Sequence, residues 1–211
     1  MRPNLASRPP YNPRPLQLLR TGAPELMRYC SACAAPVHMR IPEGDHRERY
    51  VCGSCGVIHY TNPRIVAGCL VLEGDQVLLC RRNIEPRRGY WTFPAGYLES
   101  GETIAQGAIR ETWEEAMAIV ALDDLYTLFN LPYISQVYMF YRARLLGGTF
   151  APGIESQDVR LFSESDIPWN DLAFAVVRVT LEHYFSDRKR GDFPMRIEDI
   201  LLPTLRPPEV R

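Results

Sequence analysis

The spacing of apolar and polar positions predicts one large domain of strands and helices. Apolar or alternating runs predict four strands, at 64–72, 76–80, 135–146 and 159–162. Residues 73–75 predict a turn between the first two strands, which should therefore form a hairpin. Helical spacing predicts helices at about 103–117 and 172–187, the second of which should end near Gly191. This order predicts an α/β fold with a mixed sheet sandwiched between helices.

The sequence divides into four parts. Residues 1–27 are rich in arginine and proline, and we expect a disordered tail; an organelle transit peptide is the alternative. Residues 28–62 form a cysteine-rich unit that ends at Asn62-Pro63. The large domain should cover 63–190, and 191–211 should form a C-terminal tail.

Composition limits the classes of function. Hydrophobic residues make up 46% of the chain and charged residues 23%, and no apolar run is long enough to cross a membrane. A net charge of -1 lacks the basic surface that a nucleic acid duplex requires. We therefore expect a cytoplasmic protein, without a membrane or duplex partner, that binds a small anionic ligand.

Four of the six cysteines form two close pairs, Cys30 with Cys33 and Cys52 with Cys55. Each pair lies in a tight turn, as in a four-cysteine zinc site that is structural and closed to further ligands. Disulfides and iron are the alternatives. We interpret His38, His46 and His59 as ordinary histidines, and Cys69 and Cys80 as buried core thiols.

The predicted helix at 103–117 carries clustered acids. Glu111, Glu114 and Glu115 share one side, and we expect Ala105, Ile109, Trp113 and Ala116 to form the apolar side opposite. Clustered carboxylates repel each other unless cations neutralise them, and Mg²⁺ or Mn²⁺ bound there could bridge pyrophosphate oxygens. Arg110 could pair with Glu102 or Glu111 and hold the acids in register. A solvated acidic face is the alternative interpretation.

The segment 96–115 resembles the Nudix box, G-x5-E-x7-R-E-U-x-E-E-x-G-U, in which U is apolar. The matching residues are Gly96, Glu102, Arg110, Glu111, Glu114 and Glu115. The resemblance implies that Glu111, Glu114 and Glu115 bind Mg²⁺ or Mn²⁺, with a backbone carbonyl of Ala95 or Gly96. Thr112 and Met117 depart from the pattern, and Met117, which replaces a glycine, could prolong the helix by a turn.

The order of a cysteine ribbon, NPRIVAGCL (62–70), the box and APGIES (151–156) resembles zinc-ribbon Nudix hydrolases. The plant chloroplast FAD pyrophosphatases and their bacterial relatives share this layout. The resemblance implies hydrolysis of a nucleoside diphosphate linked to X, with FAD cleaved to FMN and AMP, by a homodimer. The S-Q-P-W-P-F-P-x-S signature of NADH pyrophosphatases is absent. NADH and ADP-ribose are alternative substrates, and a non-catalytic nucleotide sensor is the alternative of another class.

Residues around the box complete the predicted site. Arginines could clamp a diphosphate and aromatic residues could stack on a ring of the substrate. The candidates are Arg81, Arg82, Arg88, Tyr90, Tyr97, Phe129 and Tyr133. Glu155, in a loop after the box, could act as the catalytic base or as a further metal ligand. Trp91 and Phe93 are predicted to pack in the core.

Overall fold

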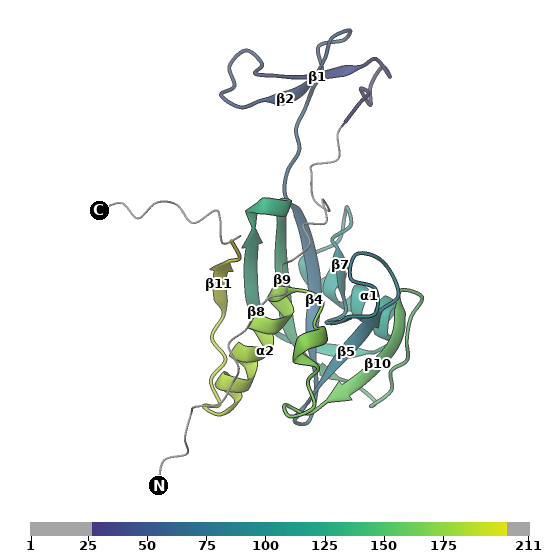
Figure 1. The fold of residues 1–211 in the computed structure, drawn as a ribbon, viewed down its shortest axis with the longest axis vertical. Coiled ribbons are helices and arrows are strands. Elements are labelled where there is room, and N and C mark those ends of the chain that lie inside the picture. Colours follow the sequence, from purple (N-terminus) through teal and green to yellow (C-terminus); the bar gives the residue numbers. More distant parts are fainter. Residues whose placement is uncertain (1–26, 202–211) are drawn as a thin grey trace, which may run out of the picture.

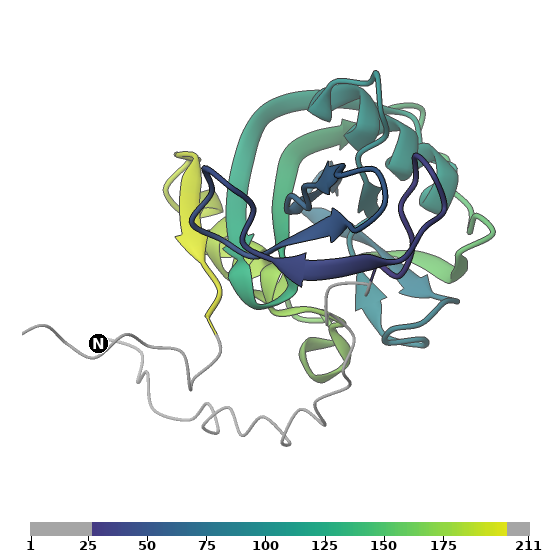
Figure 2. The ribbon, with the colours of Figure 1, turned by 90° about the horizontal axis from the view of Figure 1, so that it is seen from above.

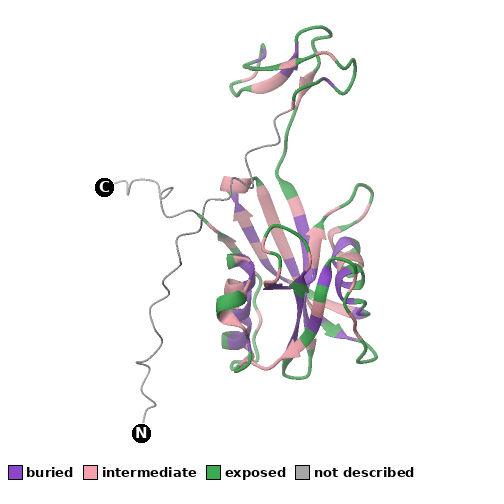
Figure 3. Ribbon diagram, turned by 45° about the vertical axis from the view of Figure 1, so that its right-hand side comes forward, coloured by how far each residue is buried: buried purple, intermediate pink, exposed green. Residues whose placement is uncertain are grey.

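The computed structural model describes residues 27–201, and it contains a small sheet and a large one (Figure 1). Residues 1–26 and 202–211, which include nearly all of the predicted N-terminal tail and the second half of the predicted C-terminal one, lie outside the described residues. The small sheet is antiparallel and consists of β1 (Val37–Arg40), β2 (Arg49–Cys52) and β3 (Ile58–His59). Most of its surface is exposed or half-buried (Figure 3). So small an apolar core needs another source of stability, such as a metal ion.

The large sheet combines parallel and antiparallel strands. Its main strands are β4 (Arg64–Glu73), β5 (Gln76–Arg82), β8 (Val120–Leu131), β9 (Gln136–Leu145), β10 (Ser156–Phe162) and β11 (Arg196–Asp199). They follow the order β10-β5-β4-β9-β8-β11, in which β4–β9 and β8–β11 are the parallel pairs. Two short strands, β6 (Trp91–Thr92) and β7 (Ala95–Tyr97), pair with β5 and β4. The sheet is therefore mixed, as predicted.

The predicted hairpin of β4 and β5 forms, but it is short. The two strands pair only at Leu72 with Val77 and at Glu73 with Gln76. Beyond these pairs they separate, because β5 pairs with β6 and β10 whereas β4 pairs with β7 and β9. The short strand β7 is thereby brought beside the start of β4, close to the helix that carries the box acids.

One helix covers each face of the sheet (Figures 1 and 2). The helix α1 (Ile104–Ala116) packs over a cluster that includes Cys69, Val71 and Ala108. The helix α2 (Ala175–Arg188) packs over a cluster with Leu70, Phe140 and Leu181. Alternate residues of β4 supply both clusters, because successive side chains of a strand point to opposite faces. Short 3-10 helices, η1 (Pro132–Ile134) and η2 (Trp169–Asp171), connect the elements. The predicted sandwich of a sheet between helices is confirmed.

Besides the short strands β6 and β7, two main strands of the large sheet were not predicted. β8 was missed because Asp123 and Asp124 interrupt its alternation, and its register with β9 shifts at Leu125. β11 lies in the segment 191–211 that we expected to be a tail, so the described sheet extends past residue 190. Arg196 at the start of β11 pairs with the buried Asp187, which fixes this strand against α2. Within the described residues, no helix is both long and apolar enough to cross a membrane.

Candidate functional site

The ribbon brings its four cysteines together. The sulfur atoms of Cys30, Cys33, Cys52 and Cys55 all lie within 4.8 Å of one another, and none forms a disulfide. The Sγ–Sγ distance is 3.7 Å between Cys30 and Cys55, 3.5 Å between Cys33 and Cys52, and 3.4 Å between Cys33 and Cys55. A tetrahedral zinc ion with Zn–S bonds of about 2.3 Å requires sulfur atoms about 3.8 Å apart. The donor set therefore fits zinc in a closed, structural site.

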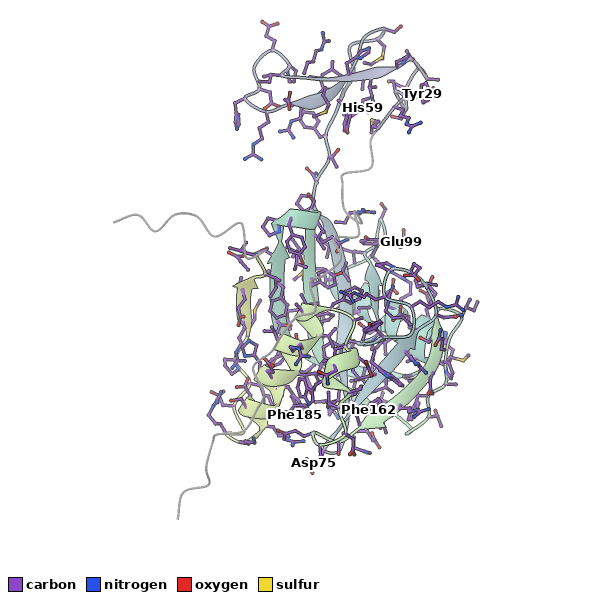
Figure 4. The ribbon with its side chains drawn as sticks, viewed as in Figure 1. Tyr29, His59, Asp75, Glu99, Phe162 and Phe185 are labelled. Atoms are coloured by element: carbon purple, nitrogen blue, oxygen red, sulfur yellow. The ribbon has the colours of Figure 1, made fainter. Side chains whose placement is uncertain are left out.

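The residue that follows each cysteine pair has a left-handed backbone. Ala34 has a φ of 59°, a left-handed conformation in which glycine would be easier, and Gly56 takes the equivalent role in the second turn with a φ of 75°. His59, which we took for an ordinary histidine, places Nε2 3.3 Å from Sγ of Cys30 (Figure 4). An imidazole N–H in this position would donate to the thiolate and reduce the charge of the site.

Local capping explains where α1 begins and ends. The hydroxyl of Thr103 accepts from the backbone N–H of Gln106, and the side chain of Gln106 accepts from the backbone N–H of Thr103. Such a reciprocal capping box fixes the first turn. The helix ends at Ala116, and Met117 follows in the left-handed conformation. Our expectation that Met117 prolongs the helix is therefore wrong: this residue terminates the helix.

The buried side of α1 differs from the predicted one. Ile109 and Trp113 are exposed by 42% and 49%, so they do not form the packed face. Residues with small side chains, together with one glutamate, face the sheet instead: Gly107, Ala108, Thr112, Glu115 and Ala116. Thr112 occupies an apolar position of the box because its hydroxyl donates to the Ala108 carbonyl at 2.7 Å and leaves its methyl group for packing. Two of the box acids, Glu111 and Glu115, consequently lie close to the sheet.

Glu115 and Glu111 are held against β7. Glu115 is 6% exposed, and one of its carboxylate oxygens accepts from the backbone N–H of Ala95 at 3.0 Å. Burial raises the pKa of Glu115 to about 8, although the Ala95 N–H lowers it and the charge of Glu111 raises it further. The Glu111 carboxylate lies against Gly96, where a β-carbon would come within 2.4 Å of it. Gly96 is therefore needed for this close approach.

Arg110 organises the remaining acids. Its guanidinium donates to Glu102 at 2.7 and 3.0 Å, to Glu111 at 2.8 Å and to Glu114 at 2.9 Å. It also donates to the Tyr97 carbonyl at 3.1 Å. The hydrogen bond from Arg110 lowers the pKa of Glu102 to about 2, whereas burial raises the pKa of Glu111. Arg110 thus pairs with both of the predicted partners, Glu102 and Glu111, and with Glu114 in addition.

The box acids and the cysteines differ in their geometry. Among the described residues, only the four cysteines bring three or more metal-binding side-chain atoms within 4.8 Å of one another. Glu111 and Glu114 turn their carboxylates toward Arg110 instead. The acids still suit a hard divalent cation, because they offer several carboxylate oxygens on one helix, although the charge of Arg110 would compete with the ion for Glu111 and Glu114. An ion would draw Glu111 and Glu114 away from Arg110.

One large cleft connects the acids with other predicted residues. Its volume is about 2150 Å³, which is ample for a dinucleotide. The predicted residues that line it are Arg82, Ala95, Gly96, Tyr97, Arg110, Glu111, Glu114, Glu115, Tyr133 and Glu155. Arg82 is 9% exposed, and its guanidinium lies over the Phe174 ring at 5.1 Å. Glu155 lines the same cleft as Glu111 and Glu115, and its charge adds to the rise of their pKa values.

Four candidates for substrate binding lie elsewhere. Arg81 donates to the Gly89 carbonyl and Arg88 to the Asn83 side chain, and neither residue lines the cleft. Tyr90, against which Arg87 stacks, is also absent from the lining. The proposal of Phe129 as a substrate-binding residue is wrong, because its side chain is fully buried in the core beneath α2. Trp91, Phe93, Cys69 and Cys80 are buried, which confirms their interpretation as core residues.

The structure also adds lining residues that were not singled out. Tyr138 on β9 and Phe174 at the start of α2 line the same cleft, as do Arg64, Met117 and Ile154. The strand pattern at 135–146 was visible in the sequence, but it could not show which face of the sheet opens to the cleft. Phe174 gave no signal, because an aromatic residue before a helix is equally suited to packing.

Comparisons with known proteins agree with this arrangement. The family described as Nudix N-terminal, a zinc ribbon, matches residues 28–61, and the NUDIX domain family matches residues 62–184. The crystal structure of a NUDIX hydrolase from Nitrosomonas europaea is 50% identical, with a TM-score of 0.80, and the match covers 82% of this chain and 99% of that one.

Curated relatives are more distant. The NAD-capped RNA hydrolase NudC of Stutzerimonas stutzeri is 31% identical over 166 residues, which cover 76% of this chain but 57% of the relative. The ADP-ribose pyrophosphatase of Methanocaldococcus jannaschii is 25% identical over 122 residues, 54% of this chain and 69% of that protein. The chain thus spans little more than half the length of the first of these relatives. The NUDIX domain family matches more than half of this chain, and a zinc ribbon family matches the residues ahead of it. The chain therefore belongs to the Nudix hydrolase family.

Proposed function

We propose that this chain hydrolyses the pyrophosphate of a nucleoside diphosphate linked to a second group X, with FAD as the preferred substrate and FMN and AMP as the products. One observation carries the proposal: the half-buried Glu111, the buried Glu115, the more exposed Glu114 and the cation Arg82 share one cleft that has room for a dinucleotide. Carboxylates and a buried guanidinium are what a metal-bound pyrophosphate requires.

Glu111, Glu114 and Glu115 would hold Mg²⁺ or Mn²⁺, with the carbonyl of Ala95 or Gly96 as a further ligand. Nudix enzymes need a divalent metal, which neutralises pyrophosphate oxygens and lowers the pKa of a water molecule. Arg110 is a positioning residue, because it fixes Glu102, Glu111 and Tyr97 relative to one another. Glu155, which lines the same cleft, would accept the proton of the attacking water as the bond between phosphorus and the bridging oxygen breaks.

The preference for FAD rests on aromatic side chains along the cleft. Tyr97, Tyr133 and Tyr138 offer ring faces or edges to the planar rings of a dinucleotide, and FAD presents more planar ring area in total than NADH. The NADH pyrophosphatase signature is absent, and residues 130–136 read NLPYISQ instead. The names of the two relatives, an NAD-capped RNA hydrolase and an ADP-ribose pyrophosphatase, favour NAD-type substrates and ADP-ribose as the second candidates.

Steady-state kinetics under one metal condition tests the assignment. We expect kcat/KM for FAD to exceed that for NADH by about five- to tenfold, since one good aromatic stack is worth about 1 kcal/mol. AMP should be a product with FAD, NADH and ADP-ribose alike. A tenfold advantage of NADH would overturn the FAD assignment and leave the pyrophosphatase. No hydrolysis of any of the three with Mg²⁺ or Mn²⁺ would favour a nucleotide sensor instead.

The same proposal includes a homodimer, as the resemblance to zinc-ribbon Nudix hydrolases implies. Sedimentation equilibrium of the full chain measures the mass directly. A species at twice 24.2 kDa is the expected result, and a monomer throughout the micromolar range would contradict the proposal.

A further inference from the structure

Met117 combines an unfavourable backbone with an exposed apolar side chain. It follows the last residue of α1 with a φ of 49° and a ψ of 28°, and its N–H donates to the Trp113 carbonyl at 2.8 Å. A side chain costs free energy in this left-handed conformation, which is why glycine is common after helices. The Met117 side chain is 45% exposed, so burial does not offset that cost. Neither the helix end nor the core explains a methionine here.

Three more exposed apolar side chains line the same cleft. Ile154 is 94% exposed, Trp113 49% and Ile84 38%. We call these three residues and Met117 the apolar rim. They come from the loop just after β5, from the last turn of α1 and the residue that follows it, and from the loop before β10. Exposed apolar groups gathered in one cleft mark a binding surface more often than chance.

The backbone of the rim is fixed relative to the box acids. In the loop at 151–154, the N–H of Ala151 donates to the Ala116 carbonyl at 2.8 Å and that of Gly153 to the Glu115 carbonyl at 3.0 Å. Gly153 lies so close to α1 that a β-carbon would come within 1.7 Å of the Glu114 carbonyl oxygen. This loop therefore caps the C-terminal end of the helix and holds Ile154 beside it.

The end of β5 is joined to the same loop. The side chain of Asn83 donates to the Ile154 carbonyl at 3.3 Å, and its backbone N–H donates to the Glu155 carbonyl at 2.8 Å. Ile84 follows Asn83 directly, so all three parts of the rim are tied together through backbone hydrogen bonds. A surface held in this way is preorganised for a ligand.

We propose that the apolar rim binds the planar ring of group X and thereby selects substrates in which X carries such a ring. The inference rests on the proposed function, which places the pyrophosphate at Glu111, Glu114 and Glu115. From there, one half of the substrate crosses the end of α1 and meets the rim. Glu114 and Glu155 border the rim and repel an anionic group, so a neutral ring suits it better than a further phosphate. The Trp113 ring and the Met117 thioether both make favourable contacts with aromatic rings.

Two substitutions at one position separate the backbone from the side chain. Met117→Gly and Met117→Asn both tolerate the left-handed conformation and both remove the thioether. We expect kcat/KM for FAD to fall by about fivefold in each, while kcat/KM for ADP-ribose, which has no planar ring in X, stays unchanged. Met117→Gly should also raise the Tm by about two degrees, because strain is released. Ile154→Ser should give the same selective loss for FAD.

A matched control comes from the same end of α1. Ile119 is 58% exposed but does not line the cleft, so Ile119→Ser should change kcat/KM neither for FAD nor for ADP-ribose. Equal losses for FAD and ADP-ribose in the Met117 variants would overturn the proposal, because the rim would then bind the part that both substrates share. The proposal would also be overturned if the Met117 variants kept the wild-type ratio of kcat/KM for FAD to kcat/KM for ADP-ribose and had a lower mass in sedimentation. The rim would then be an interface between two copies of the chain.

Direct binding separates this proposal from the proposed function. Calorimetric titration with FAD and with ADP-ribose requires no turnover. If the wild-type chain hydrolyses neither compound but Met117→Gly weakens FAD binding alone by about fivefold, the pyrophosphatase assignment fails and the rim stands. If hydrolysis occurs and Met117→Gly changes neither binding nor the ratio of rates, the rim proposal fails and the pyrophosphatase stands.

Discussion

At the scale of single residues, Glu115 stands out because a carboxylate with 6% exposure lies on the sheet side of α1. A group whose pKa burial raises to about 8 is costly to keep ionised, and a bound cation would offset that cost. Glutamine has the same shape and can still accept from the Ala95 N–H, but it carries no charge. This makes glutamine the informative replacement.

We therefore expect Glu115→Gln to fold and to lose at least ~10²-fold in turnover at saturating Mg²⁺, which is roughly 3 kcal/mol of barrier. Initial rates of AMP release from FAD give the measurement, and circular dichroism reports the fold. Glu182→Gln, at an exposed position on α2, is the matched control and should keep full activity. Near-normal turnover in the Glu115 variant would contradict the metal site and would favour the alternative, in which the acids of α1 form only a solvated face.

At the scale of elements, the loop at 151–154 and the end of α1 depend on the absence of one side chain. We expect Gly153→Ala to lower the free energy of unfolding by about 1–3 kcal/mol, because the new methyl group meets the Glu114 backbone and forces the loop outward. The hydrolysis rate should fall as well, since Glu155 moves with the loop. Gly53→Ala is the control: its methyl group would meet only His38, at 3.8 Å. If the two variants had the same free energy of unfolding in urea, the loop at 151–154 would be able to move away from α1 without loss of stability.

The junction of α2 and β11 should respond to pH. Asp187 has a fully buried side chain that accepts from Tyr126 at 2.7 Å and from Arg196 at 2.7 Å. Burial alone would raise its pKa, but the hydrogen bonds from Arg196 and Tyr126 outweigh burial and lower it. A lowered pKa in the folded state means that the unfolded state binds the proton more readily. The contribution of Asp187 to stability is therefore complete above its ordinary pKa and is lost as the pH falls through the lower, folded value.

Urea titrations of the wild-type chain and of Asp187→Asn at pH 7 and pH 3 measure this contribution. The difference in unfolding free energy should be about 3 kcal/mol at pH 7 and clearly smaller at pH 3. Asp166→Asn, which removes a carboxylate on the surface, is the control. A difference that is the same at both pH values would mean that packing, and not the charge of Asp187, holds the junction.

The elements also show what the sequence could and could not predict. α1 and the acids on it were predictable, because the box fixes their spacing and a capping residue marks the start. The buried side of α1 was not, since Ile109 and Trp113 are apolar by composition yet exposed in the structure. Phe129 was misplaced because it belongs to β8, whose two aspartates and shifted register hid the strand. β11 consists of three charged residues and the exposed Ile197, a pattern with no period to detect.

At the scale of the whole molecule, the chain joins a domain with a large core to a ribbon with almost none. Few apolar residues of the ribbon are buried, namely Cys30, Pro42, Val51 and Cys52, so the metal should supply most of its stability. We expect one zinc ion per chain by elemental analysis of protein purified without chelator. Neither zinc nor iron near that stoichiometry would contradict the site.

Removing one ligand should separate the two units. Cys52→Ser should abolish the stoichiometric metal and expose the ribbon to proteolysis, because the closed site needs all four thiolates. The hydrolysis step should persist in the surviving population, since the box acids lie on α1. Ser54→Ala, beside the same turn, is the control for substitution within the ribbon. A loss of kcat in Cys52→Ser that matches the loss in Glu115→Gln would mean that the ribbon acts in the chemistry.

The parallel pairing of β11 with β8 has a consequence for synthesis. Parallel strands cannot be joined by a tight turn, and here the partner of Thr127–Asn130 arrives only with Arg196–Asp199. While the ribosome adds the intervening residues, β8 presents an unpaired edge that another nascent chain could extend. A gene fragment ending at residue 190 would make that temporary state permanent and would leave Asp187 without Arg196. Such a fragment should collect in inclusion bodies, whereas one that reaches residue 201 should remain in the supernatant.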